Sequence, residues 1–172
     1  MHTKIMKKLS TNQIALAGEF AVLSQLSLHG FDANLTLGNT KGVDILLSNP
    51  GTGTMRRLEV KTHSHNKPYN NKDFGRVIAQ WTMSDKHEDI HDKDLFFCFV
   101  SIQAETSDFE FYIVPKKIVE DFVKMSHARW LRNDSKRSDS PMRSFQLGSK
   151  EFKYTTKPPF AEDYRNRWDL LK

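Results

Sequence analysis

The hydrophobic and polar positions of the first third of the chain predict a helix followed by three short strands. Residues 10–30 begin with Ser10 and Gln13 at capping-box spacing and end at Gly30, a common helix stop, so we expect one long helix there. The segments that follow alternate apolar and polar residues and are separated by turn residues, as strands are. These three expected strands cover residues 31–37, 43–48 and 56–62.

The rest of the chain combines strongly apolar strands with a second helix. Strands are expected at residues 95–103 and 109–115, and apolar residues at roughly helical spacing predict a helix at residues 115–132. Residues 63–75 read as a polar loop, and residues 76–94 are ambiguous between strand and helix. This order of elements predicts an α/β fold with a mixed central β-sheet flanked by helices.

The length of 172 residues favours a single domain that spans residues 1–172. We expect its core in about residues 10–131. Residues 132–172 are expected to form a polar loop, with one possible strand, and a C-terminal extension. No internal repeat divides the chain further.

Composition is typical of a soluble globular protein, with 38% hydrophobic and 27% charged residues. No apolar run approaches the ~18 residues that a membrane span needs. The basic N-terminus lacks the apolar segment of a signal peptide. Cys98 is the one cysteine and lies in an apolar run, so we expect it to pack in the core of a cytoplasmic protein.

The net charge of +5 permits an anionic partner such as nucleic acid without demanding one. Charge alone therefore leaves the function open. The acidic residues of the first half of the chain are more informative.

Two expected strands bring acidic residues together if residues 43–62 form a hairpin. With its loop at Pro50–Gly53, the hairpin pairs Asp44 with Glu59, Leu46 with Arg57 and Ser48 with Met55. Opposite residues lie about 4.5–5.5 Å apart at Cβ, and side chains two apart on a strand share a face. Asp44, Glu59 and Lys61 are therefore expected on one face.

Two carboxylates that face each other repel, so the fold gains nothing from this pair by itself. A hard divalent cation such as Mg²⁺ between Asp44 and Glu59 turns the repulsion into binding, and the carbonyl of Val60 is a plausible further ligand. Lys61 could then hold or help deprotonate an attacking water. The chemistry that this set predicts is metal-dependent hydrolysis of a phosphate ester.

Glu19 is a fourth acidic residue in an unusual position. On a helical wheel it falls among Leu16, Leu23 and Leu26, and burial of an unpaired carboxylate is costly. Glu19 therefore either reaches solvent at the rim of the helix or has a partner elsewhere in the fold.

Glu19 on a first helix, then "GVD" (Gly42–Asp44) and "EVK" (Glu59–Lys61), resemble the PD-(D/E)xK nuclease superfamily. This group includes restriction endonucleases, Holliday-junction resolvases and repair nucleases. The resemblance covers about residues 10–62, and Val43 stands where the family pattern nominally has proline.

The resemblance implies a restriction-endonuclease-like core in which Asp44 and Glu59 bind Mg²⁺ or Mn²⁺. It also implies that Lys61 is the catalytic lysine and that Glu19 supports the metal site directly or through water. DNA would be the substrate. Many relatives cut both strands as dimers, so a homodimer is possible, and no protein partner is indicated.

Four further residues are candidates for contact with nucleic acid. Thr40 and Lys41 precede Asp44 closely, and His63 follows Lys61. Gln80 is expected to point into a cleft, whereas its neighbour Trp81 is expected in the core.

Two other readings remain open beside a Mg²⁺-dependent endonuclease. The same fold could serve as a non-catalytic module that binds nucleic acid or a protein. The stretch "HEDIH" also places His87 and His91 at the spacing of a zinc-peptidase helix, but polar residues surround it and no third ligand follows. A solvated helix or loop explains that stretch better than a zinc site.

Overall fold

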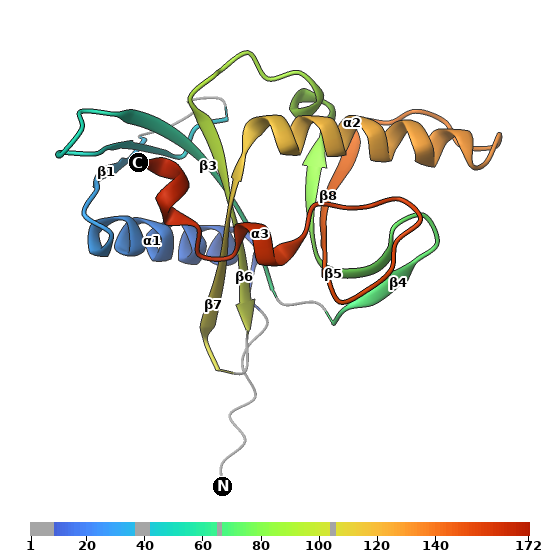
Figure 1. The fold of residues 1–172 in the computed structure, drawn as a ribbon, viewed down its shortest axis with the longest axis horizontal. Helices are drawn as coiled ribbons and strands as arrows, with labels where there is room; N and C mark the ends of the chain where they lie inside the picture. The colour runs from blue at the N-terminus through green and yellow to red at the C-terminus, as the bar shows by residue number, and fades with distance from the viewer. Residues whose placement is uncertain (1–8, 37–41, 65–66, 104–105) are drawn as a thin grey trace, which may run out of the picture.

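The computed structural model describes residues 9–36, 42–64, 67–103 and 106–172 (Figure 1). The first element, α1, spans Thr11–Leu28 and begins with the predicted capping box. Ser10 Oγ accepts from the backbone N–H of Gln13, and Gln13 Oε1 accepts from the backbone N–H of Ser10. The helix is followed by Gly30, whose φ of 82° lies in the left-handed region that glycine adopts at helix ends.

A five-stranded mixed sheet forms the centre of the fold, in the strand order β1-β2-β3-β6-β7. Strands β3 and β6 run parallel, and the other neighbours run antiparallel. The mixed α/β fold that the sequence predicts is therefore confirmed. The strands span Asp32–Leu35 (β1), Ile45–Ser48 (β2), Met55–Ser64 (β3), Leu95–Gln103 (β6) and Asp108–Pro115 (β7).

The β2–β3 hairpin has the predicted register. Leu46 pairs with Arg57 and Ser48 pairs with Met55. The turn between them closes through the carbonyl of Asn49, which accepts from the N–H of Gly53 at 2.8 Å. Because β3 has ten residues and β2 only four, β3 continues past the start of β2, and no described strand pairs with it there on the β2 side. We call this part of β3 its open edge.

A second, three-stranded sheet was not predicted. It is antiparallel, has the order β4-β5-β8, and consists of Tyr69–Asn71 (β4), Gly75–Ser84 (β5) and Met142–Gly148 (β8). The expected loop at residues 63–75 thus contains β4, which is three residues long, polar, and without the alternation that reveals a strand. The ambiguous segment 76–94 resolves into most of β5 and a short 3₁₀ helix, η1 (Asp85–Glu88).

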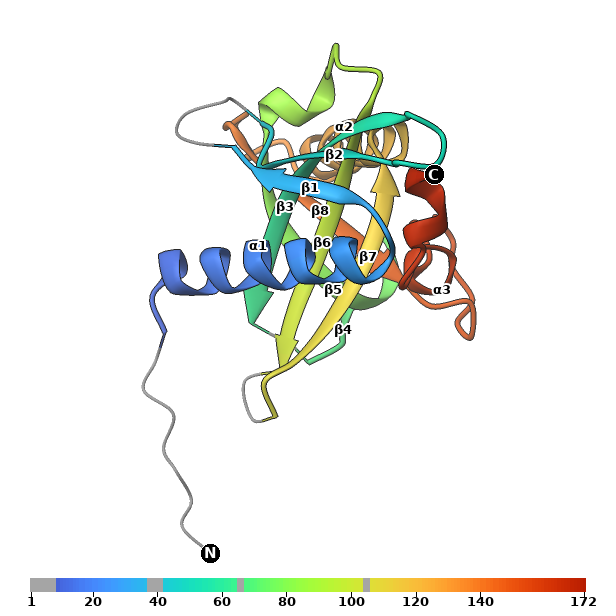
Figure 2. The same ribbon diagram turned by 90° about the vertical axis from the view of Figure 1, so that its left-hand side faces the viewer.

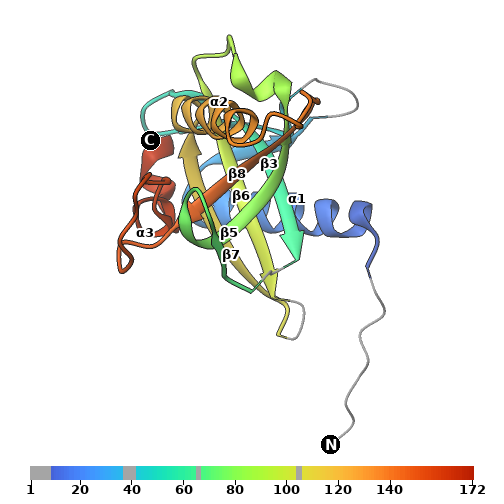
Figure 3. The same cartoon turned by 90° about the vertical axis from the view of Figure 1, so that its right-hand side faces the viewer.

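The large sheet is covered differently on its two faces. Helix α1 lies across β3, β6 and β7 on one face (Figure 2). Val22 and Leu26 of the helix share an apolar cluster with Leu58 and Val60 of β3. On the other face lie β5, β8 and the second helix, α2 (Lys116–Arg132), in a separate apolar cluster (Figure 3). The β-rich cover on this face is the main departure from a sheet flanked by helices alone.

The C-terminal segment contributes to both clusters. Strand β8 supplies Phe145 and Leu147 to the cluster beneath α2. Trp168 and Leu171, in the 3₁₀ helix η2 (Trp168–Leu171) that follows the short helix α3 (Ala161–Tyr164), pack in the cluster beneath α1. Residues 132–172, expected to form a polar loop, one possible strand and a C-terminal extension, therefore belong to the packed body of the protein, and the possible strand is β8.

A glycine sets how closely α1 approaches the sheet. A Cβ atom at Gly18 would lie 1.9 Å from Thr62 Oγ1, so only glycine allows the helix to cross β3 at this point. The buried residues of α1 are Gly18, Val22 and Leu26. Leu16, expected in the same apolar row as Glu19, is instead 52% exposed.

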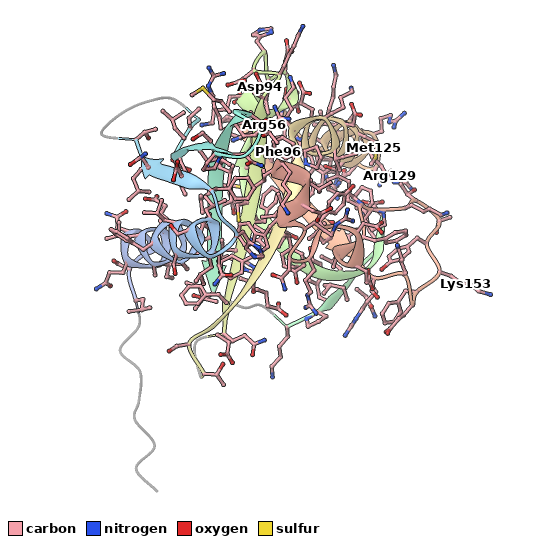
Figure 4. The ribbon with its side chains drawn as sticks, turned by 60° about the vertical axis from the view of Figure 1, so that its left-hand side comes forward. Arg56, Asp94, Phe96, Met125, Arg129 and Lys153 are labelled. Atoms are coloured by element: carbon pink, nitrogen blue, oxygen red, sulfur yellow. The ribbon has the colours of Figure 1, made fainter. Side chains whose placement is uncertain are left out.

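Charged contacts hold the start of β3 to the segment before β6. Arg56 Nη1 lies 3.1 Å from Asp94 Oδ1, and its guanidinium lies over the ring of Phe96 (Figure 4). Arg57 Nη1 lies 2.8 Å from Asp92 Oδ2. Cys98 is fully buried in β6, as expected, and burial raises the pKa of its thiol. Within the described residues, no helix combines the length and apolar character required for crossing a membrane.

Candidate active site

The site is built around two side chains on one face of β3. Glu59 is buried, with 3% of its surface exposed, and Lys61 is two residues further along the strand. Lys61 Nζ lies 2.6 Å from Glu59 Oε1. Because side chains two apart on a strand share a face, the strand itself brings the acid and the base together, as the sequence predicts.

Helix η1 supplies a third member of the site that the sequence analysis missed. His87 is buried, and its Nε2 lies 3.1 Å from Glu59 Oε1. Its Nδ1 lies 3.0 Å from both the backbone nitrogen and the carbonyl oxygen of Ser84. Because a carboxylate oxygen can only accept, Nε2 carries the proton that His87 donates to Glu59.

The "HEDIH" stretch therefore serves Glu59 and does not form a zinc-peptidase helix. The 3₁₀ helix ends at Glu88, so His87 and His91 do not share a helix face. His91 has 92% of its side chain exposed, whereas His87 is buried. The expected solvated helix or loop is thus right for His91 and wrong for His87, which the fold buries against Glu59.

The partners of Glu59 decide its ionisation. Burial on its own raises the pKa of a carboxyl group, but the hydrogen bond from His87 and the charge and hydrogen bond of Lys61 outweigh it. Together they lower the pKa of Glu59 to about 2. Glu59 is therefore a carboxylate at neutral pH despite its burial.

Asp44 lies just before β2, at the open edge of β3. Its backbone N–H donates to the carbonyl of Leu58 at 2.8 Å, and its Oδ2 accepts from the N–H of Val60 at 2.7 Å. Asp44 thus extends the hydrogen-bonded ladder of the hairpin by one residue before the start of β2. Its carboxylate lies at the edge of β3 that β2 leaves uncovered. The predicted juxtaposition of Asp44 with Glu59 follows from this register.

The environment of Asp44 raises the pKa of its carboxyl group, whereas the environment of Glu59 lowers the pKa of that residue. Burial raises the pKa of Asp44, and the charge of Glu59 raises it further. The N–H of Val60 and the charge of Lys61 lower it only in part. Two neighbouring carboxyl groups therefore have pKa values shifted in opposite directions.

Glu19 reaches the same place from α1. It follows Gly18, whose contact with Thr62 fixes the helix against β3. Burial raises the pKa of Glu19, the charge of Asp44 raises it further, and the charge of Lys61 lowers it. The Glu19 carboxyl therefore lies within electrostatic range of Asp44 and Lys61, and the anomalous acid of the first helix has neighbours of both charges.

The donor chemistry of this cluster suits a hard cation. No described residue donates a hydrogen bond to Asp44 Oδ1 or Glu59 Oε2. The carbonyl of Val60 faces the same edge as its N–H, because both groups of a strand residue face one neighbouring strand. Among the described residues, no group of three or more His, Cys, Asp or Glu side chains is close enough to hold a metal ion. The oxygen ligands that this cluster could provide to a cation are therefore the carboxylates of Asp44 and Glu59 and the carbonyl of Val60.

A hollow of about 550 Å³ opens beside Lys61. Lys61, His63 and Gln80 all line it, so three of the predicted site residues share one surface. His63 also packs edge-on against Trp81, with ring centroids 4.7 Å apart. Trp81 is in the core, as expected. Thr40 and Lys41, the two predicted phosphate contacts, lie outside the described residues.

No protein-family model matches the chain, and no curated protein matches it. Among solved structures, a bacterial homing endonuclease, I-Ssp6803I, is similar with a TM-score of 0.50 and 14% sequence identity. The similarity covers 95% of this chain and 92% of that chain, so it takes in both sheets. At this identity the comparison shows a shared fold.

Proposed function

We propose that this protein is a metal-dependent endonuclease of the PD-(D/E)xK type that hydrolyses phosphodiester bonds in DNA. The observation that carries the proposal is the convergence of Asp44, Glu59, Lys61 and Glu19 at the open edge of β3. Burial and mutual repulsion disfavour the ionised forms of Asp44 and Glu19, so these two residues lower the stability of the fold. A functional role accounts for their presence at this position. The fold shared with a homing endonuclease supports the same reading.

In this proposal, Asp44, Glu59 and the carbonyl of Val60 would hold Mg²⁺ or Mn²⁺. When bound, the cation would polarise the scissile phosphate and favour the deprotonation of a water molecule. Glu19 would orient that water or support the cation through it. His87 keeps Glu59 ionised and oriented, as outer partners of metal ligands do.

Lys61 would contact the phosphate directly. Its ammonium group is held by Glu59 on one side and lines the hollow on the other. A cation in that position stabilises the negative charge that grows on the phosphate oxygens as water attacks. Among the residues that would not bind the cation, we therefore expect substitution of Lys61 to have the largest effect on cleavage.

Nicking of supercoiled plasmid DNA tests the proposal. The wild-type protein should nick the plasmid with Mg²⁺ or Mn²⁺ and should stop in EDTA. Lys61→Ala should abolish nicking, whereas Lys117→Ala, an exposed lysine on α2, should leave it unchanged. Binding of DNA without nicking under either metal would contradict the proposal and favour a non-catalytic binding module on this fold.

A further inference from the structure

The three-stranded sheet has one apolar face and one polar face. Its apolar face packs inward and carries Ala79, Trp81, Met83, Phe145 and Leu147. The residues between them point to the opposite side, because strand side chains alternate. There Gln80 pairs with Gln146 and Thr82 pairs with Ser144 across β5 and β8. We call these four residues the amide face.

The two glutamines are arranged by a small hydrogen-bond network. Gln146 Nε2 donates to Gln80 Oε1 at 3.1 Å, and the hydroxyl group of Tyr69 donates to the same oxygen. These two donors fix the orientation of the Gln80 amide. Among the described residues, none accepts a hydrogen bond from Gln80 Nε2. The amide is therefore preorganised to donate outward.

Gln146 adds an acceptor to the same place. It is 5% exposed, and its Oε1 is buried without a hydrogen-bond partner among the described residues. Buried polar atoms nearly always have partners, so an unpartnered carbonyl oxygen marks a position where a donor is missing. Gln146 lines a hollow of the surface, so a ligand in that hollow can supply the missing donor.

The amide face adjoins the candidate active site. Gln80 and Thr82 line the hollow that contains Lys61, and both also line a second hollow of about 280 Å³. Gln146 and Ser144 belong to the second hollow, whose wall includes Trp130 of α2. A ligand held over the amide face therefore reaches Lys61 without crossing another element.

The chemistry of these side chains suits the edges of bases and not phosphates. Carboxamides pair with the N7 acceptor and N6 donor of adenine, and hydroxyl groups hydrogen-bond to base edges or contact the thymine methyl group. Phosphate contacts come mainly from lysine and arginine, which the amide face lacks. Lys67 is exposed and lines the first hollow, so it can make them. The major groove is wide enough to admit a two-stranded β-ribbon.

We propose that the amide face is the sequence-reading surface of this protein and recognises A·T base pairs in the major groove of duplex DNA. The inference rests on the proposed endonuclease function and adds to it where the specificity lies. Gln80 donates to adenine N7, and Gln146 accepts from adenine N6. Thr82 contacts a base about two steps away, because two strand residues span about 6.6 Å and each base-pair step about 3.4 Å.

Selection of binding sites from a pool of randomised DNA duplexes tests this assignment. The full chain is used in EDTA, so binding is measured without cleavage. Wild-type protein should enrich A·T pairs at defined positions by roughly 10- to 100-fold over other pairs. Gln80→Leu should reduce the preference at one position to about twofold, and Thr82→Val should change a different, nearby position. Gln25→Leu, a glutamine on α1, is the matched control and should keep the wild-type preference.

The outcomes separate this inference from the proposed function. Loss of preference in Gln80→Leu and Thr82→Val, with their thermal stability retained, supports the amide face. If the protein nicks plasmid with metal but selects no sequence, or if both variants keep the wild-type preference, the amide face is overturned while the endonuclease stands. If the protein neither binds DNA nor nicks it, both proposals fail together.

Discussion

Two polar surfaces of this protein lie side by side and differ in kind. At the open edge of β3 the polar groups are charged, crowded and wholly or partly buried, and the pKa values of Asp44 and Glu59 are shifted in opposite directions. On the amide face the polar groups of β5 and β8 are neutral amides and hydroxyls. Charge concentrated at one point suits the breaking of a bond between phosphate and sugar, whereas neutral donors and acceptors suit the discrimination of one base from another.

This difference implies that the two surfaces are separable by substitution. Changes at β3 should alter how fast DNA is cut and leave unchanged which DNA is bound. Changes on the amide face should do the reverse. The following predictions test that separation in order of expected size.

The largest effect is expected from the charged groups at β3. Asp44→Ala and Lys61→Ala should each lower the cleavage rate by roughly 10²–10³-fold or more, because each removes a charge placed for the transition state. Plasmid nicking rates measure this, with Asp108→Ala at the exposed start of β7 as the control. The base preference of both β3 variants should match that of the wild type; a changed preference would show that the surfaces are not separable.

Glu59→Gln should produce the largest loss of stability among the site substitutions. The pKa of Glu59 falls from 4.5 to about 2 on folding, which corresponds to about 3 kcal/mol of stabilisation as an upper bound. This stabilisation is complete above the unfolded pKa of 4.5 and is lost as the pH falls towards 2. Urea unfolding should therefore separate wild type from Glu59→Gln at neutral pH by up to that amount.

The pH dependence gives the matching control. The difference in unfolding free energy between the two proteins should shrink steadily below pH 4.5, because the unfolded wild-type chain then takes up the Glu59 proton while the folded protein does so only near pH 2. A difference that stays constant between neutral pH and about pH 2 would mean that lost packing, and not the ionised carboxylate, accounts for the effect.

Both the register and the core of the site could be predicted from the sequence because their determinants are local. Strand alternation places Glu59 and Lys61 on one face, and the turn residues Pro50–Gly53 fix which residue faces Asp44. The partner of Glu59 could not be predicted, because His87 is reached only by folding a distant segment back onto β3. Its histidine pattern also resembles a different kind of site.

The amide face could not be predicted from the sequence for a different reason. Gln80 was expected to face a cleft, but its partner Gln146 belongs to a segment expected to lie outside the core. A register shift between Val77 and Ala79 interrupts the regular pairing of β5 with β8, and β4 shows no alternation at all. A sheet assembled from such segments has no continuous signal along the chain.

Gly18→Ala should cost about 1–3 kcal/mol in stability, the usual range for overpacking. The new methyl group would meet Thr62 Oγ1 and push α1 away from β3. Since Glu19 follows Gly18, cleavage should fall as well, while base preference should not. Thermal unfolding and nicking measure the two effects. Thr62→Ala in the same protein removes the nearest clashing atom and should restore part of both; no rescue would argue against this contact.

The smallest effect is a gain of stability. Burial raises the pKa of Asp44, so the folded protein binds this proton more tightly than the unfolded chain. The ionised form therefore costs stability above the folded pKa, and that cost disappears as the pH falls below it. Asp44→Asn keeps an oxygen that can accept from the N–H of Val60, so it should be at least as stable as the wild type at neutral pH in a urea titration.

The central claim is that the acidic cluster at β3 exists for metal-dependent cleavage of DNA, and Asp44→Asn tests it most directly. The measurement is the rate of plasmid nicking by wild type and Asp44→Asn over a range of Mg²⁺ and Mn²⁺ concentrations, with EDTA as the blank. The account predicts metal-dependent nicking by the wild type and none by a variant that is folded and equally stable. Nicking by Asp44→Asn at the wild-type rate, or wild-type nicking that persists in EDTA, would contradict it.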